Sequence, residues 1–151
     1  MLPSVKTFIS HLRDLYAEDL DDLSRYKKIR PTLQELLNDP ELNERAENWP
    51  SRNNPAKGYY ENLLFYEDPD YGFAINGLTK AANSRSPKGG IHDHAHIYTL
   101  YGVLDGQETI ERYERLDDGS KPDFAEIRQS GVLKAGPGDV DLVKPFEIHV
   151  E

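Results

Sequence analysis

Three of the five histidines in the chain lie together in one short segment, Gly90–Tyr98. They occupy the alternate positions His92, His94 and His96. Successive side chains of an extended strand point to opposite faces, so His92 and His94 are expected to project the same way. Two imidazoles on one rigid face favour a divalent-metal site, because imidazole suits iron, zinc, copper and nickel. The alternative is a row of polar residues at the edge of a strand.

A third imidazole is available near the end of the sequence, where His149 closes a segment that begins at Gly138. An early His-x-His and a later His on a separate strand are how a small β-barrel builds a three-imidazole site. His96 has the parity of an inward residue, so it is a candidate for a fourth ligand, for a group that orients a ligand, or for a pocket-lining residue.

At these residues the sequence resembles the cupin superfamily. The first cupin motif, Gly-x5-His-x-His-x4-Glu-x6-Gly, is matched at His92, His94 and Gly106. The second motif, Gly-x5-Pro-x-Gly-x2-His, is matched at Gly138 and His149 with the end-to-end spacing of the family. The resemblance implies a cupin-type double-stranded β-helix barrel.

The departures from these motifs narrow the resemblance. Thr99 stands where the first motif has its ligand Glu, and Ser86 stands at its first Gly. In the second motif Pro145 is displaced by one position and the inner Gly is missing. Three His without the Glu is the pattern of the thiol dioxygenases, the cysteine dioxygenase group. The segment Gly58–Leu64 also looks like that group.

The resemblance implies a mononuclear non-haem Fe(II) site with open positions for a thiolate and dioxygen, and oxidation of a small thiol to a sulfinate. The metal ligands it implies are His92, His94 and His149. The residues it suggests for catalysis are Tyr98 and Tyr59, and those for substrate binding are His96, Tyr101 and Glu61. Tyr98 and Tyr101 have opposite parity, so only one of them can face the interior of a regular strand.

Glu61 bears on the choice of substrate. Thiol dioxygenases that act on carboxylated thiols clamp the carboxylate with the Arg of a Tyr-x-Arg sequence, and Glu61 stands at that position. A Glu repels a carboxylate. We therefore expect an amine-bearing or neutral thiol, unless Arg52 or Arg85 supplies the missing cation.

Two alternatives to a thiol dioxygenase stay open. One is a cupin that binds a metal or small ligand without turnover, and the other is a cupin enzyme of different chemistry, such as an isomerase or a carbon dioxygenase. Barrels of this type host many chemistries, so fold analogy does not separate them. The metal could then be Zn, Ni, Cu or Mn instead of iron.

The elements that must position these residues follow an α+β order. Residues 1–50 have helical periodicity, with Ser4 expected to cap the first helix, Pro31 to begin a short helix, and Asp39-Pro40 to begin another. After a linker at 49–55 the period becomes two, which predicts a β domain over residues 57–151. The strands are expected at 59–66, 71–80, 94–104, 108–116, 125–133, 140–143 and around residue 148. Asp105-Gly106 is typical of a hairpin turn.

The composition limits partners and location. A net charge of −9 with no basic patch argues against nucleic acid. No apolar run approaches eighteen residues and no export signal is present, so we expect no membrane span and a cytoplasmic protein. Cysteine is absent, which excludes thiolate ligands. The chain stops two residues after His149, where a cupin barrel still has closing strands. Either the chain is a shortened form, or a second copy in a homodimer covers the open edge.

Overall fold

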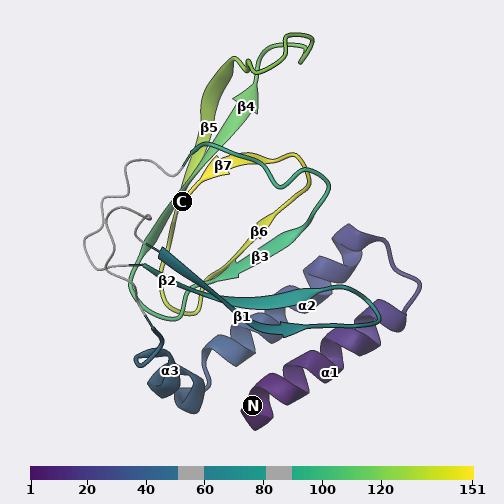
Figure 1. Cartoon of the computed structure of the whole chain (residues 1–151), viewed down its shortest axis with the longest axis vertical. Helices are drawn as coiled ribbons and strands as arrows, with labels where there is room; N and C mark the ends of the chain where they lie inside the picture. Colours follow the sequence, from purple (N-terminus) through teal and green to yellow (C-terminus); the bar gives the residue numbers. More distant parts are fainter. Residues whose placement is uncertain (51–59, 81–89) are drawn as a thin grey trace.

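The computed structural model describes residues 1–50, 60–80 and 90–151. Within these ranges three helices are followed by seven strands (Figure 1). The helices are α1 (Pro3–Ala17), α2 (Asp22–Leu37) and α3 (Pro40–Ala46). The strands are β1 (Tyr60–Glu67), β2 (Ala74–Lys80), β3 (Thr99–Gly102), β4 (Glu108–Arg115), β5 (Ile127–Ala135), β6 (Val140–Val143) and β7 (Ile148–Val150). This order confirms the α+β class.

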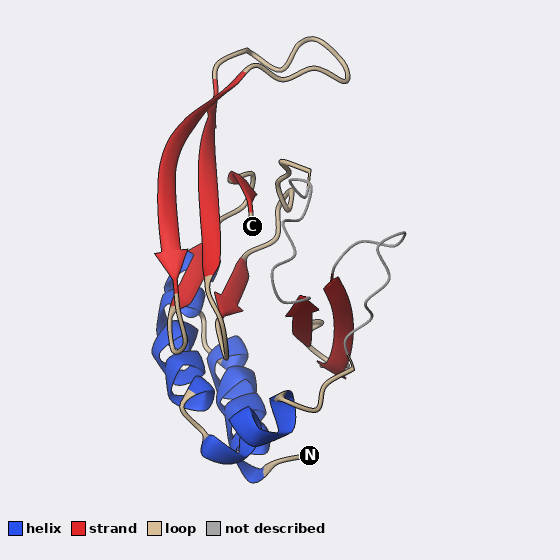
Figure 2. Cartoon of the chain, turned by 90° about the vertical axis from the view of Figure 1, so that its left-hand side faces the viewer, coloured by secondary structure: helices blue, strands red, loops and turns tan. Residues whose placement is uncertain are grey.

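The helices lie together at one end of the molecule, and the strands extend from that end (Figure 2). Their apolar faces meet in one core, which also takes in a residue of the loop between β1 and β2. Its buried members are Phe8, Leu12, Leu15, Ile29, Leu36 and Phe73. Leu100 of β3 packs against this core as well. The helical segment therefore shares its apolar interior with the strands.

The helix boundaries confirm one prediction and correct two. Asp39 caps α3, accepting from the N–H of Glu41, and Pro40 is its first residue. Pro31, however, lies inside α2. Apolar residues on both sides of Pro31 are buried, so packing holds one continuous helix although the proline removes a backbone donor. Ser4 does not cap α1, because its hydroxyl donates to Asp39 instead.

A buried carboxylate fastens the β1–β2 hairpin to α1. Asp68 is 1% exposed and accepts from Arg13 at 2.5 Å, from the Tyr66 hydroxyl at 2.8 Å, and from the N–H groups of Asp70 and Tyr71. Burial alone would raise the pKa of Asp68, but these hydrogen bonds outweigh burial and lower the pKa to about 2. The carboxylate is therefore ionised at neutral pH.

Some strands pair with strands that are not their neighbours in the sequence. β1 pairs with β2, β3 pairs with β6, and β4 lies between β5 and β7, all antiparallel. His92, which lies outside the named strands, forms a bridge with His149 of β7. The segments 92–102 and 140–149 therefore pair antiparallel at both ends, through His92 with His149 and through β3 with β6.

Two strand predictions are wrong. The strand expected at 94–104 covers only Thr99–Gly102, because the chain turns at Ala95 and His96. Ala95 has φ +50°, which a regular strand does not allow. The turn at Asp105-Gly106 does not close a hairpin, since β3 pairs with β6 and β4 with β5 and β7.

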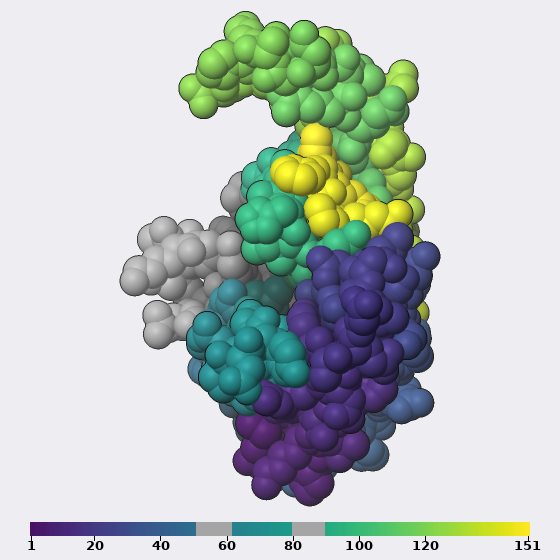
Figure 3. All heavy atoms as spheres, turned by 90° about the vertical axis from the view of Figure 1, so that its right-hand side faces the viewer, coloured from purple at the N-terminus to yellow at the C-terminus, as the bar shows by residue number. Residues whose placement is uncertain are grey.

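The β4–β5 hairpin extends past the rest of the molecule (Figure 3). Its base contributes Ile110 and Ala135 to a second buried cluster with Val103. In the part of the chain that the structure describes, no helix combines the length and the apolar character needed to cross a bilayer.

Candidate metal centre

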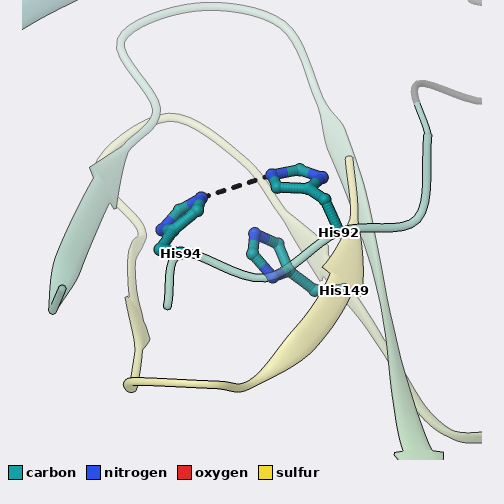
Figure 4. Close-up of side chains that lie close together, drawn as sticks. All are labelled: His92, His94 and His149. Atoms are coloured by element: carbon teal, nitrogen blue, oxygen red, sulfur yellow. Dashed lines mark hydrogen bonds between the residues drawn. The ribbon is translucent and has the colours of Figure 1, made fainter. Parts of the chain in front are cut away.

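The three histidines of the two motif segments meet at one point (Figure 4). One ring nitrogen from each of His92, His94 and His149 lies within 4.8 Å of the other two. The Nε2 atoms of His92 and His94 are 3.3 Å apart. Two nitrogens bound at about 2.0–2.1 Å to one ion are at most about 4.2 Å apart. The group therefore needs only a small contraction to hold a metal ion.

The backbone brings these rings together without a regular strand at His94. His92 and His149 exchange both backbone hydrogen bonds, at 3.0 and 2.9 Å. After His94 the chain turns at Ala95, whose carbonyl accepts from the N–H of Phe146 at 2.6 Å. Ala95 and Phe146 both have left-handed φ angles, of 50° and 58°. Two strained residues thus flank the histidines, which is common at functional sites.

Each imidazole is oriented through its Nδ1 atom. His92 Nδ1 donates to the carbonyl of Gly90 at 2.9 Å, and His149 Nδ1 donates to the carbonyl of Glu147 at 2.9 Å. A carbonyl oxygen only accepts, so both rings carry a proton on Nδ1, and in the neutral form each presents a lone pair at Nε2. His94 Nδ1 lies 2.8 Å from the Thr99 hydroxyl. Hydrogen bonds of this kind fix the ring and tautomer of metal-binding histidines.

Burial and charge also fit a metal ligand set. The His149 side chain is fully buried, and among the described residues its Nε2 has no hydrogen-bond partner. A buried polar atom without a partner is costly, and a metal ion satisfies it. Burial lowers the pKa of His94, and the nearby His149 and His92 lower it further. A neutral imidazole is the form that binds a metal.

A buried ion-pair network supports the strand that carries His149. Arg112 of β4 lies opposite His149 in the β4–β7 pairing. Its Nη2 donates to both oxygens of Asp141, at 2.8 and 2.7 Å, and its Nε donates to Glu147. Glu147 also supplies the carbonyl that orients His149. The network thereby links β4, β6 and the start of β7 beside the histidines.

The charged segment of Glu111, Arg112, Glu114 and Arg115 is typical of a solvated sheet face, and for Arg112 this interpretation is wrong. Arg112 has the parity of Ile110, which is buried, so it faces the interior. Its neighbour Glu114 does pair at the surface, with Arg128 across the β4–β5 hairpin.

The structure separates the two tyrosines of this segment. The Tyr101 hydroxyl lies 3.3 Å from His94 Nε2, whereas the ring of Tyr98 packs against Tyr26 of α2, with centroids 5.1 Å apart. Tyr101 is therefore the one beside the histidines, contrary to the catalytic place predicted for Tyr98. His96 is exposed in the turn after His94, so the strand parity used for it does not apply.

Two other predicted site residues cannot be placed beside the histidines. Tyr59 lies outside the described residues, as do Arg52, Arg85 and Ser86. Glu61 belongs to β1, but its side chain is not described.

Sequence reasoning missed two residues. Thr99 was noted only as a replacement for a ligand, yet it orients His94. Glu151 was not considered, although its Oε1 is buried 3.7 Å from His149 Nε2. Its position two residues after His149 was the available signal, because residues i and i+2 of an extended segment share a face.

Comparison with known proteins identifies no relative: no model of a protein family matches the chain, and no curated protein matches it. The functional assignment therefore depends on the site itself.

Proposed function

We propose that the chain is a mononuclear non-haem Fe(II) dioxygenase of the cysteine dioxygenase-like cupin type, which oxidises a small thiol to a sulfinate. The observation that carries this proposal is the convergence of three imidazoles, each held through Nδ1. Their ring nitrogens lie within 4.8 Å of one another. Imidazole ligands with open positions suit non-haem iron.

The strand pairing supports the cupin part of the proposal. Cupins are double-sheet jelly rolls, in which early and late strands of the domain pair. Here β3 pairs with β6, and His92, ahead of β3, forms a bridge with His149 of β7. β7 pairs in turn with β4, and β4 with β5, which gives a separate three-stranded sheet.

The backbone at the motif glycines supports it too. Gly106 and Gly138 have φ angles of 78° and 86°. Phe146 occupies the position of the missing inner glycine, and it has φ 58° although it is not glycine. The left-handed conformation that favours glycine is therefore kept at a position where the residue has changed.

Thr99 supports the three-histidine variant of the site. It stands at the position of the ligand Glu, and its hydroxyl lies against Nδ1 of His94, on the ring edge opposite Nε2. The side chain at this position thus orients a ligand and does not itself act as one.

When bound, Fe(II) would lower the pKa of a thiol and hold thiolate and dioxygen adjacent. The reaction, R–SH + O₂ → R–SO₂H, balances without a further reductant, because sulfur supplies all four electrons. His92, His94 and His149 hold the metal, and the Tyr101 hydroxyl, 3.3 Å from His94 Nε2, donates a hydrogen bond to a reactant bound beside that ring.

The acidic character of the site argues for an amine-bearing or neutral thiol. Glu151 places a carboxylate 3.7 Å from His149 Nε2. A carboxylate there disfavours a carboxylated substrate by repulsion, and Glu61 stands in the sequence at the position of the clamping Arg. Turnover of carboxylate thiols but not of aminothiols would contradict this preference.

The competing function is a metal-binding cupin without turnover. The exposure of His92 favours it, because a site open to water protects reactive species poorly.

Metal content and oxygen uptake separate these functions. The protein is purified without chelators, its metals are measured by elemental analysis, and oxygen consumption is followed with amino, neutral and carboxylated thiols. We expect iron near one per chain and sulfinate formation, both lost in His149→Ala and kept in His11→Ala, which changes a histidine of α1. Bound zinc, nickel or copper, or iron without oxygen uptake, would contradict the dioxygenase.

A further inference from the structure

Glu151 follows β7 directly and shares a face with His149. Val150, between them, is buried on the other side, at 6% exposed. The alternation directs Glu151 to the same side of the segment as His149, where its Oε1 lies 3.7 Å from His149 Nε2.

His149 Nε2 and Glu151 Oε1 face each other without a hydrogen-bond donor among the described residues. Both are buried, and no hydrogen bond reaches them from the described residues. His149 donates through Nδ1 to the carbonyl of Glu147, so in the neutral imidazole, the form that binds a metal, its Nε2 is an acceptor. An ionised carboxylate is an acceptor only. Two buried acceptors side by side are unfavourable, and a cation between them would satisfy both.

We propose that Glu151 is a fourth protein ligand, so that the metal is held by three imidazoles and one carboxylate. This inference rests on the proposed metal site. Ligand atoms at about 2.0–2.2 Å from one ion lie about 3 Å apart when adjacent and about 4 Å when opposite, so 3.7 Å fits a shared ion. The carboxylate that the first cupin motif supplies from the Thr99 position comes instead from the segment after the last histidine.

A fourth ligand restricts the substrate. Four protein ligands would leave a six-coordinate metal two positions, which is room for one thiolate and dioxygen. A substrate that chelates through sulfur and nitrogen would need a third position. The site therefore takes thiols that bind through sulfur alone, with any amine left to hydrogen-bond elsewhere.

The test compares Co²⁺ binding by the wild-type chain, Glu151→Gln and the control Glu114→Gln, which changes an exposed glutamate of β4. Affinity is measured by competition with a chromophoric chelator, and coordination by the visible absorption of Co²⁺. We expect Glu151→Gln to bind at least tenfold more weakly and with a changed spectrum. Glu114→Gln should match the wild type. Without metal, Glu151→Gln should melt at or above the wild-type temperature, because it removes a buried carboxylate that has no partner.

The outcomes distinguish this inference from the proposed function. Wild-type affinity and spectrum in Glu151→Gln would overturn the fourth ligand, while loss of binding in His149→Ala would still support the histidine site. Weaker binding with an unchanged spectrum would place Glu151 outside the coordination sphere and overturn its role as a ligand. A lower melting temperature of metal-free Glu151→Gln would indicate a structural role. No Co²⁺ or Fe²⁺ binding by the wild-type chain would refute the metal site itself.

Discussion

Replacing Arg112 by methionine tests whether an internal ion-pair network holds the strand that carries His149. Methionine keeps an apolar stem of similar length but removes the guanidinium, which donates to Asp141 at 2.8 and 2.7 Å and to Glu147. Two partly buried carboxylates then lose their counter-ion. We expect a lower free energy of unfolding and weaker metal binding, because Glu147 also orients His149.

The size of the effect follows from burial. Removing one partner of a buried ion pair costs about 3–5 kcal/mol, since the other charge stays buried and unpaired. Asp141 is 7% exposed, but the side chains of Arg112 and Glu147 are each 23% exposed, so water screens part of the loss. We expect a cost of about 2–4 kcal/mol, against about 0.2–1 kcal/mol for an exposed pair.

Urea denaturation of the metal-free protein, with chelator present, measures this cost. Arg128→Met is the matched control, because Arg128 pairs with Glu114 at 3.0 Å with both side chains exposed. Adding Asp141→Asn and Glu147→Gln to Arg112→Met should recover part of the stability, since no charge is then left unpaired. The reasoning is refuted if Arg112→Met costs no more than Arg128→Met, or if the neutral triple variant recovers nothing.

Three further predictions follow from single side chains. Phe146→Gly should stabilise the fold by up to about 1 kcal/mol in urea denaturation. The relief of left-handed backbone strain, roughly 1–2 kcal/mol, exceeds the entropy cost of glycine, roughly 0.5–1 kcal/mol. Phe146→Ala should bring no such gain, and a glycine variant less stable than the wild type would contradict the strain. Asp68→Asn should destabilise the protein at neutral pH, and the difference from wild type should shrink below the unfolded-state pKa of about 3.9 and vanish as pH falls through the folded-state pKa of about 2. A difference that is constant from pH 6 to 2 in a denaturation series would show that the charge of Asp68 contributes nothing. Thr99→Val should weaken metal binding about 10–100-fold by freeing the ring of His94, whereas Thr99→Ser should keep it; equal affinities in a chelator competition would argue against this role.

Motif spacing was enough to select the three histidines that converge, since His92, His94 and His149 were chosen from the sequence and their ring nitrogens meet. The reason given for two of them was only partly right. His92 and His94 do not lie on one regular strand, because the chain turns immediately after His94. Spacing identified the converging histidines although the local backbone differed from expectation.

The sequence by itself determined the α+β order, the cap of α3 at Asp39 and the candidate ligands. These depend on local physics: the side-chain period changes from helix to strand, and capping and turn residues act on their near neighbours. The sequence did not determine which strands pair, since β3 pairs with β6 through contacts between residues distant in the chain.

Only the tertiary structure decided how the site is supported. It turned Arg112 inward to Asp141 and Glu147, and it set Tyr101 instead of Tyr98 beside His94. Each of these outcomes depends on which groups from other elements face a side chain, and on whether burial leaves that side chain a partner. Such contacts are set when the elements pack, so no local pattern in the chain contains them.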